Sequence, residues 1–389
     1  MTSTTSTTST TSTTSGAGTT SGAGTTSAPG RSTGGTPAGD SAAVGAVPAG
    51  AAAASPLLSR PGAVEGDGPD AGVAAHYGDP MREQRLLDEG LAVVDLSHRG
   101  IVTVTGPDRL AWLHSMTTQQ LTGLGPRESR ESLVLSPKGH IEHDLHLVDD
   151  GETTWITTEP GGAGALVAWL DSMRFMLRVE VSDVTAGWAV LGETSSAESL
   201  PGEALAWRDP WPDVVGDTAA YGPVEGHPAT GRAWREVLVP RPELAAAVGD
   251  RPLAGTWASE ALRVAAWRPR LGFETDHRTI AHEIDWLRTA VHLHKGCYRG
   301  QETIARVHNL GRPPRRLVFL HLDGSGHTIP ERGEAVYAGG DRAVGHLTSV
   351  ARHFEDGPIA LALVKRSTDP AAQLLAGGVS ASQEVIVAP

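Results

Sequence analysis

One short stretch places the chain's single thiol between two glycines and two residues after a lysine. Cys297 is the only cysteine among 389 residues, and Gly296 and Gly300 flank it. Glycines at these positions indicate a tight turn that presents the thiol instead of burying it in a regular element. A nearby cation favours the thiolate, which is the nucleophilic and metal-binding form. We therefore interpret Cys297 as a nucleophile or ligand activated by Lys295. The alternative is that a lone cysteine is a small buried apolar residue.

The sequence around the thiol resembles the signature of a known family. Residues 295–306 read Lys-Gly-Cys-Tyr-x-Gly-Gln-Glu-x-x-Ala-Arg, which is similar to the motif of the YgfZ family of folate-binding proteins, relatives of the T-protein of the glycine cleavage system. Besides the lysine, the cysteine and the glycines, the motif contains Tyr298, Gln301, Glu302 and Arg306. Residues 95–114 resemble the opening of the T-protein superfamily domain. The resemblance covers about residues 85–385, and it implies a three-lobed α+β folate-binding fold that ends in a small antiparallel β-barrel.

The resemblance also implies a cofactor, tetrahydrofolate or a one-carbon derivative, in a central cavity. Asp144 corresponds to a strand carboxylate near the pterin, and Glu283 is a candidate to accept hydrogen bonds from the pterin amino and ring N–H groups. Arg306 and Arg315 are candidates for binding the carboxylates of the folate tail. The alternative for Asp144 is a solvated strand face, and the alternative for Glu283 is an exposed charge at a helix end.

Two departures from the family pattern speak against a classical transferase. Aminomethyltransferase relatives typically have paired aspartates where this sequence has His143-Asp144, and a glutamate where it has Ala265. We therefore predict an assembly factor more than a classical enzyme: a folate-binding accessory protein of iron–sulfur cluster assembly or repair, acting through Cys297 on client or assembly proteins. One alternative is a tetrahydrofolate-dependent aminomethyl- or methyl-transferase. A second is an RNA-contacting protein associated with tRNA modification.

A series of arginines follows the thiol, and its function is open at this point. The series is Arg299, Arg306, Arg312, Arg315 and Arg316. It could be an ordinary solvated face, a clamp for the glutamate tail of folate, or a contact surface for tRNA. Because aromatic residues are not interleaved with these arginines, we rank RNA below folate carboxylates.

Composition excludes several classes of protein. The formal net charge is −13, so the chain as a whole is no polyanion binder. One cysteine cannot form an internal disulfide, a paired-cysteine zinc site or a four-thiolate cluster site. No HExxH pattern occurs, and we expect no metal site. No apolar run reaches the length of a membrane span, so we expect a cytoplasmic monomer without membrane contact.

Sequence complexity divides the chain into three parts. Residues 1–78 are rich in Thr, Ser, Gly, Ala and Pro, which predicts a disordered tail with no part in the site. The tail lacks a basic start followed by an apolar core, so we do not expect a secretory signal. Residues 79–311 are predicted to form a folate-binding region of two lobes, and residues 312–389 a barrel domain with short alternating strands.

The predicted elements around the site are mostly short strands. Residues 132–136 and 141–148 predict a hairpin that turns at 137–139, with Glu142, Asp144 and His146 on one face. Strands are predicted at 101–105, 153–157 and 187–192, and helices at 164–178, 241–248 and 256–267. Residues 194–233 are rich in Pro, Gly and Asp and predict a long surface excursion.

Overall fold

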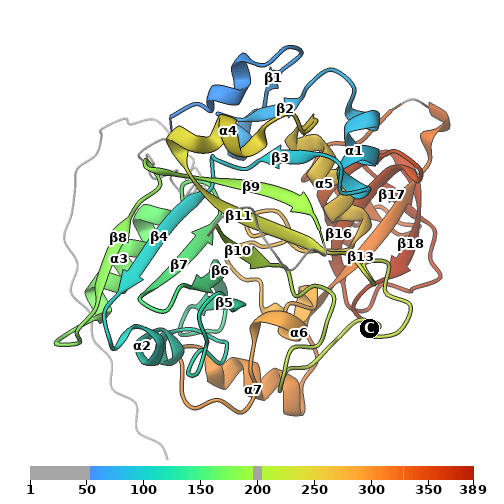
Figure 1. The fold of residues 1–389 in the computed structure, drawn as a ribbon. Coiled ribbons are helices and arrows are strands. Elements are labelled where there is room, and N and C mark those ends of the chain that lie inside the picture. Colours follow the sequence, from blue (N-terminus) through green and yellow to red (C-terminus); the bar gives the residue numbers. More distant parts are fainter. Residues whose placement is uncertain (1–52, 196–203, 327) are drawn as a thin grey trace, which may run out of the picture. The chain divides into compact units, whose positions relative to one another are not determined.

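A computed structural model (Figure 1) describes residues 53–195, 204–326 and 328–389, all within one compact unit that spans residues 46–389. Residues 1–52, most of the predicted tail, lie outside the described residues, as do residues 196–203 of the predicted excursion. The end of the predicted tail has regular structure, because β1 (Val64–Glu65) pairs with β2 (Ala74–His76). Leu57 is buried in an apolar cluster with Val93. Ordered structure therefore begins well before residue 78, the predicted end of the tail.

The first lobe is a five-stranded antiparallel sheet in the order β5-β6-β7-β4-β8. Its strands are β5 (Ser129–Leu135), β6 (Ile141–Asp149), β7 (Thr153–Thr158), β4 (Gly100–Thr105) and β8 (Glu180–Asp183). Helices α2 (Arg109–Met116) and α3 (Ala163–Met173) bury Leu113, Leu166 and Leu170 against this sheet. The predicted hairpin is confirmed, although its first strand begins three residues earlier than expected.

The second lobe is a five-stranded sheet in the order β10-β11-β9-β3-β12. Its strands are β10 (Leu205–Arg208), β11 (Trp234–Pro240), β9 (Trp188–Thr194), β3 (Val93–Asp95) and β12 (Leu253–Ala254). Helices α1 (Pro80–Asp88), α4 (Leu244–Val248) and α5 (Thr256–Ala265) belong to this part of the chain. Their buried residues Leu87, Leu244 and Ala258 contribute to the apolar clusters of the sheet.

The predicted surface excursion at 194–233 is confirmed for residues 212–233, which form no helix or strand and are mostly exposed or partly exposed, but it is wrong for residues 205–211. This segment contains β10, and its tryptophans Trp207 and Trp211 are only 2% and 1% exposed. The indole nitrogen of Trp207 donates to the carbonyl of Arg130, and that of Trp211 to the carbonyl of Ala266. The prediction failed because turn-forming residues are abundant in this segment, and because the four-residue strand β10 is too short to show a clear alternation of apolar and polar residues.

The third lobe is a closed six-stranded barrel in the order β13-β16-β15-β14-β17-β18. Its strands are β13 (Arg315–Leu322), β14 (Ala335–Tyr337), β15 (Gly345–His353), β16 (Gly357–Lys365), β17 (Leu374–Ala376) and β18 (Val379–Val385). The predicted terminal barrel is thereby confirmed. Two short helices, α6 (Leu287–Ala290) and α7 (Gln301–Leu310), precede it. Among the described residues, no helix is long and apolar enough to cross a membrane.

Candidate functional site

The cysteine loop, residues 295–300, connects α6 to α7 and presents the thiol to solvent. Cys297 is exposed, and Gly296 and Gly300 have φ angles of +40° and +84°. These left-handed conformations are the ones that favour glycine. Tyr298 points the other way and is buried in the apolar cluster below the loop. Gln301 and Glu302 form the first turn of α7, where a negative charge is favourable.

Lys295 anchors this loop to the rest of the protein. Its side chain is buried, and Nζ donates to the carbonyl oxygens of His114, Thr117 (2.5 Å) and Gln119 (3.0 Å) at the end of α2. Burial lowers the pKa of Lys295 to about 7, and the three carbonyl oxygens act in the opposite direction because they bind the protonated form. All three ammonium protons are thus used by backbone carbonyls. The sequence predicted that Lys295 activates Cys297. In the structure, Lys295 instead binds backbone carbonyls and positions the loop that carries Cys297.

Gly300 holds the other end of the loop against the turn of the β5–β6 hairpin. A Cβ atom at Gly300 would lie 2.7 Å from the carbonyl oxygen of Ser136 and 2.9 Å from Cβ of Leu135. Gly139, in the hairpin turn, has equally little space, because a Cβ there would lie 2.6 Å from Cβ of Thr303. The close approach of two backbones therefore requires glycine on both sides.

We expect Gly300→Ala to destabilise this docking by roughly 1–3 kcal/mol, since it adds a steric collision to a left-handed backbone. Gly296→Ala is the matched control, because its Cβ would meet nothing within 4 Å. The measurement is urea unfolding together with hydrogen exchange of the amides of α7. Equal losses in the two variants would contradict the close contact between Gly300 and the hairpin.

The predicted arginine series does not form one continuous surface. Arg299 pairs with Glu142 (2.9 Å), and Arg306 is exposed on α7. Arg316 is fully buried and donates to the carbonyl of Thr368. The described contacts therefore favour neither a single clamp nor a continuous RNA-binding strip.

The predicted folate-binding residues are also not brought together. Arg315 makes two hydrogen bonds to Glu283 (2.9 and 2.8 Å) and also binds Asp276 (2.7 Å). Both oxygens of the buried Glu283 carboxylate are thus used by an internal ion pair. Asp144 instead lines the central cavity, whose lining includes neither Glu283, Arg306 nor Arg315. These four residues do not form a common pterin site in this structure.

The central cavity lies among residues of β6, β10, β11 and α5, and both positively and negatively charged side chains line it. Its arginines are Arg99, Arg232, Arg263, Arg268 and Arg270. Its carboxylates are Asp70, Asp144, Glu159, Asp209, Glu236 and Glu260. Arg270 binds Asp70 (2.8 Å) and Glu159 (2.9 Å), so a residue of the predicted tail contributes to the cavity after all. Most of this lining is therefore held in buried ion pairs.

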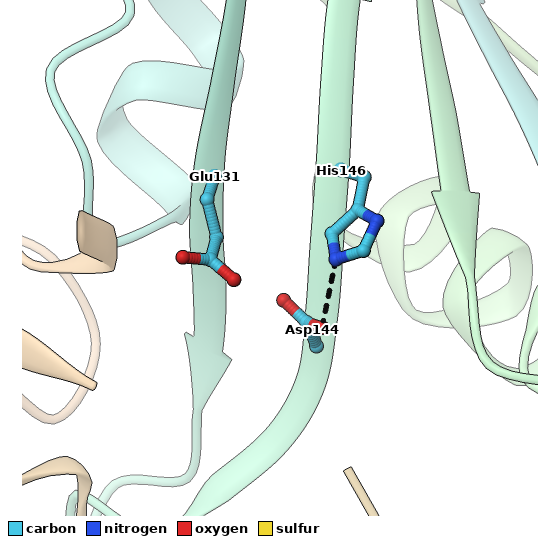
Figure 2. A group of neighbouring side chains, drawn as sticks. All are labelled: Glu131, Asp144 and His146. Carbon is cyan, nitrogen blue, oxygen red and sulfur yellow. Dashed lines mark ion pairs between the residues drawn. The ribbon is translucent and has the colours of Figure 1, made fainter. Parts of the chain in front are cut away.

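Asp144 and His146 of the cavity lining form a group of three titratable side chains with the neighbouring Glu131, shown in Figure 2. Glu131 on β5 lies directly opposite His146 on β6, and Asp144 is two residues before His146. Nε2 of His146 is 3.2 Å from Asp144, and its Nδ1 is 2.9 Å from Glu236. Although burial acts against the charge, Glu236 and Asp144 raise the pKa of His146 to about 10. Burial raises the pKa of Glu131 against the opposing charge of Arg268.

In this group, a function was predicted only for Asp144; His146 was predicted on the same strand face, and Glu131 and Glu236 were not predicted. Glu131 precedes the predicted strand, and Glu236 lies on β11, which was not predicted. Extending the predicted hairpin by one pair would have placed Glu131 opposite His146. Glu142 was expected on the face of Asp144, but the hairpin register shifts near this point and Glu142 is exposed.

The cavity, with its side chains as they are placed, does not fit tetrahydrofolate. Its volume is about 70 Å³, and the ligand pockets of proteins generally start at roughly 300 Å³. It is enough for a few water molecules, which occupy roughly 30 Å³ each in the liquid. The lining arginines and carboxylates already bind one another, so a pterin would have to displace several buried ion pairs. No chemical step is therefore assigned to folate in this cavity.

Comparison with known proteins relates both ends of the described region to one family. Residues 74–192 match the GCVT N-terminal domain, and residues 315–385 match the glycine cleavage T-protein C-terminal barrel domain. The chain is 26% identical over 301 residues to a putative chloroplastic transferase of Arabidopsis thaliana, covering 71% of this chain and 68% of that protein. It is 29% identical over 295 residues to an aminomethyltransferase of Rubrobacter xylanophilus, covering 70% and 75%.

A solved structure extends this likeness to the fold. The glycine cleavage system aminomethyltransferase T from Bartonella henselae superposes with a TM-score of 0.67 at 19% identity. The match covers 86% of this chain and 95% of that chain. The three lobes described above therefore have a counterpart of the same architecture.

Proposed function

The chain matches both domain models of the glycine cleavage T-protein, and from this premise we propose that it is an accessory protein of iron–sulfur cluster assembly or repair, acting through Cys297. The observation that carries this proposal is the exposed thiol on a loop that Lys295 and Gly300 hold in place. Fixed presentation of a single thiol suits transient contact with a cluster or a client protein, whereas a buried structural cysteine would need no such support.

Two features argue against the transferase activity that the relatives' names describe. The central cavity is small and filled by ion pairs, so a pterin has no ready place in it. His143 and Ala265 also depart from the acidic residues that aminomethyltransferases typically carry, as the sequence analysis noted. A shared fold does not carry the shared activity by itself, because activity depends on the site.

In the proposed mechanism, Cys297 supplies one ligand to iron that is cargo. The thiol releases its proton to solvent, and the thiolate takes a coordination position from a leaving ligand of the donor. No electron is transferred in this exchange, and the iron moves on when a client thiolate replaces Cys297 in turn. Lys295 keeps the loop in position and forms no bond to the cargo.

The test is complementation of a deletion strain with the wild type, Cys297→Ala and Met176→Ala. Met176 is 98% exposed in another loop, so its variant removes an exposed sulfur-containing side chain as a matched control. We expect iron–sulfur enzyme activities to fall in the deletion strain. The wild type and Met176→Ala should restore them, and Cys297→Ala should not, at equal protein levels.

Full restoration by Cys297→Ala would show that the thiol is not the acting group. If the deletion leaves these activities unchanged, the transferase is tested directly with purified protein, tetrahydrofolate and an aminomethylated lipoyl carrier. Turnover in that assay would replace the present proposal.

A further inference from the structure

We propose that Glu131, Asp144 and His146 form a binding site for one divalent transition-metal ion in the central cavity. The sequence analysis expected no metal site, because the three residues match no metal-binding motif and Glu131 was not placed on the hairpin. This inference goes beyond the proposed function and does not depend on Cys297. It can fail or succeed independently of the role of the thiol.

The hairpin geometry directs all three side chains to one place. One ligand atom from each residue lies within 4.8 Å of the other two, and Figure 2 shows the Glu131 and Asp144 carboxylates turned toward one another. Metal–ligand bonds of roughly 2.0–2.2 Å place opposing ligand atoms at most about 4.4 Å apart. Small side-chain rotations would therefore bring the three atoms to coordination distance.

Two buried carboxylate oxygens of this group have hydrogen-bonding capacity that no described residue uses. Oε2 of Glu131 and Oδ1 of Asp144 have no hydrogen-bond partner among the described residues. Glu131 is 0% exposed and Asp144 is 5% exposed, so neither side chain reaches bulk solvent. Buried carboxylate oxygens without partners are costly, and they require a water, a proton or a cation.

His146 has the support that a metal-binding histidine usually has. Its ring stacks on Trp207 with a centroid distance of 3.6 Å, and its Nδ1 lies 2.9 Å from Glu236. Histidines that bind metals generally donate the other ring N–H to a carboxylate, which orients the ring. Arg99 binds the same Glu236 carboxylate and holds it in place. Nε2 then faces Asp144 and would ligate the ion after losing its proton.

Charge and volume both favour a small cation. The six carboxylates of the lining and Glu131 outnumber the five arginines of the lining by two. One divalent ion would balance this excess. The cavity of about 70 Å³ has room for an ion with one or two waters. One imidazole and two carboxylates suit Zn²⁺, Mn²⁺ or Fe²⁺ better than Ca²⁺, which takes six to eight oxygen ligands.

The test uses the full chain after treatment with EDTA and dialysis, with Zn²⁺ and Co²⁺ as probes. We expect calorimetry to detect one tight Zn²⁺ site per chain, Zn²⁺ to raise the melting temperature, and Co²⁺ to give a visible absorption band. Glu131→Gln and Asp144→Asn should each weaken binding at least tenfold. Glu142→Gln, which removes an exposed carboxylate of the same strand, and Cys297→Ala should leave it unchanged.

Circular dichroism establishes that the variants are folded, and the wild-type titration does not depend on any variant. Absence of a stoichiometric site in the wild type would overturn the proposal, and water or a shared proton would then satisfy the two oxygens. Equal binding in all variants would assign the metal to surface histidines and would overturn the proposal as well.

Discussion

Replacement of Arg268 by leucine is expected to lower the free energy of unfolding by about 3–5 kcal/mol, because it leaves buried carboxylates without a counter-charge. The guanidinium is 5% exposed and binds Glu131, which is 0% exposed, and Asp209 (3.2 Å). It also lies over the rings of Trp211 and Trp286 at 5.3 and 5.8 Å. The measurement is urea unfolding in the presence of EDTA.

A second variant separates the lost charge from the lost packing. In the double variant Arg268→Leu/Glu131→Gln, a neutral amide replaces the carboxylate of Glu131. The amide oxygen can still accept the hydrogen bond from Trp286. We expect the double variant to be more stable than Arg268→Leu alone. Arg278→Leu is the control, because Arg278 is an exposed partner of Asp276 at 3.8 Å and should contribute less than about 1 kcal/mol. A double variant less stable than the single one would mean that packing, and not the unpaired charge, dominates.

Replacement of Lys295 by methionine is expected to cost about 2–4 kcal/mol and to remove the Cys297-dependent activity although the thiol remains. The change leaves the carbonyls of His114, Thr117 and Gln119 without their donor, and each unsatisfied buried acceptor costs roughly 1–3 kcal/mol. Recovery of the desolvation cost of the ammonium offsets part of this loss. The measurements are urea unfolding and the complementation assay.

Lys365→Met is the matched control. Lys365 is exposed, and its Nζ donates to the single carbonyl of Ala343 (2.9 Å). We expect its unfolding free energy and its complementation to stay close to those of the wild type. If Lys295→Met were as stable and as active as Lys365→Met, the loop would not need its anchor, and the positioning role of Lys295 would be excluded.

The central cavity is the feature that argues against the activity of the relatives. The architecture has three lobes, and the cavity among residues of the first two lobes is filled by arginine–carboxylate pairs. Such a buried network is specific and hard to rearrange, because removing any one member leaves an uncompensated charge. Our two proposals therefore place the chemistry at the surface loop with Cys297 and at the group around His146.

Local sequence was sufficient for the β5–β6 hairpin, the terminal barrel and the presented thiol. The hairpin of β5 and β6 and the terminal barrel follow from short alternating strands separated by turn residues. The turn at Cys297 follows from its glycines, because few other residues adopt positive φ angles. Periodicity and backbone preference act over a few residues, so they can be read without knowledge of the fold.

Only the tertiary structure decided which charges pair with which. Asp70 binds Arg270, Glu283 binds Arg315, and Lys295 binds carbonyls at the end of α2, each across a long stretch of chain. A charged residue in a sequence looks the same whether it will bind solvent, a cofactor or another side chain. That choice depends on burial and on distant partners, which are fixed only when the lobes pack around the cavity. The sequence therefore determined the thiol and its turn, and the packing determined the central cavity.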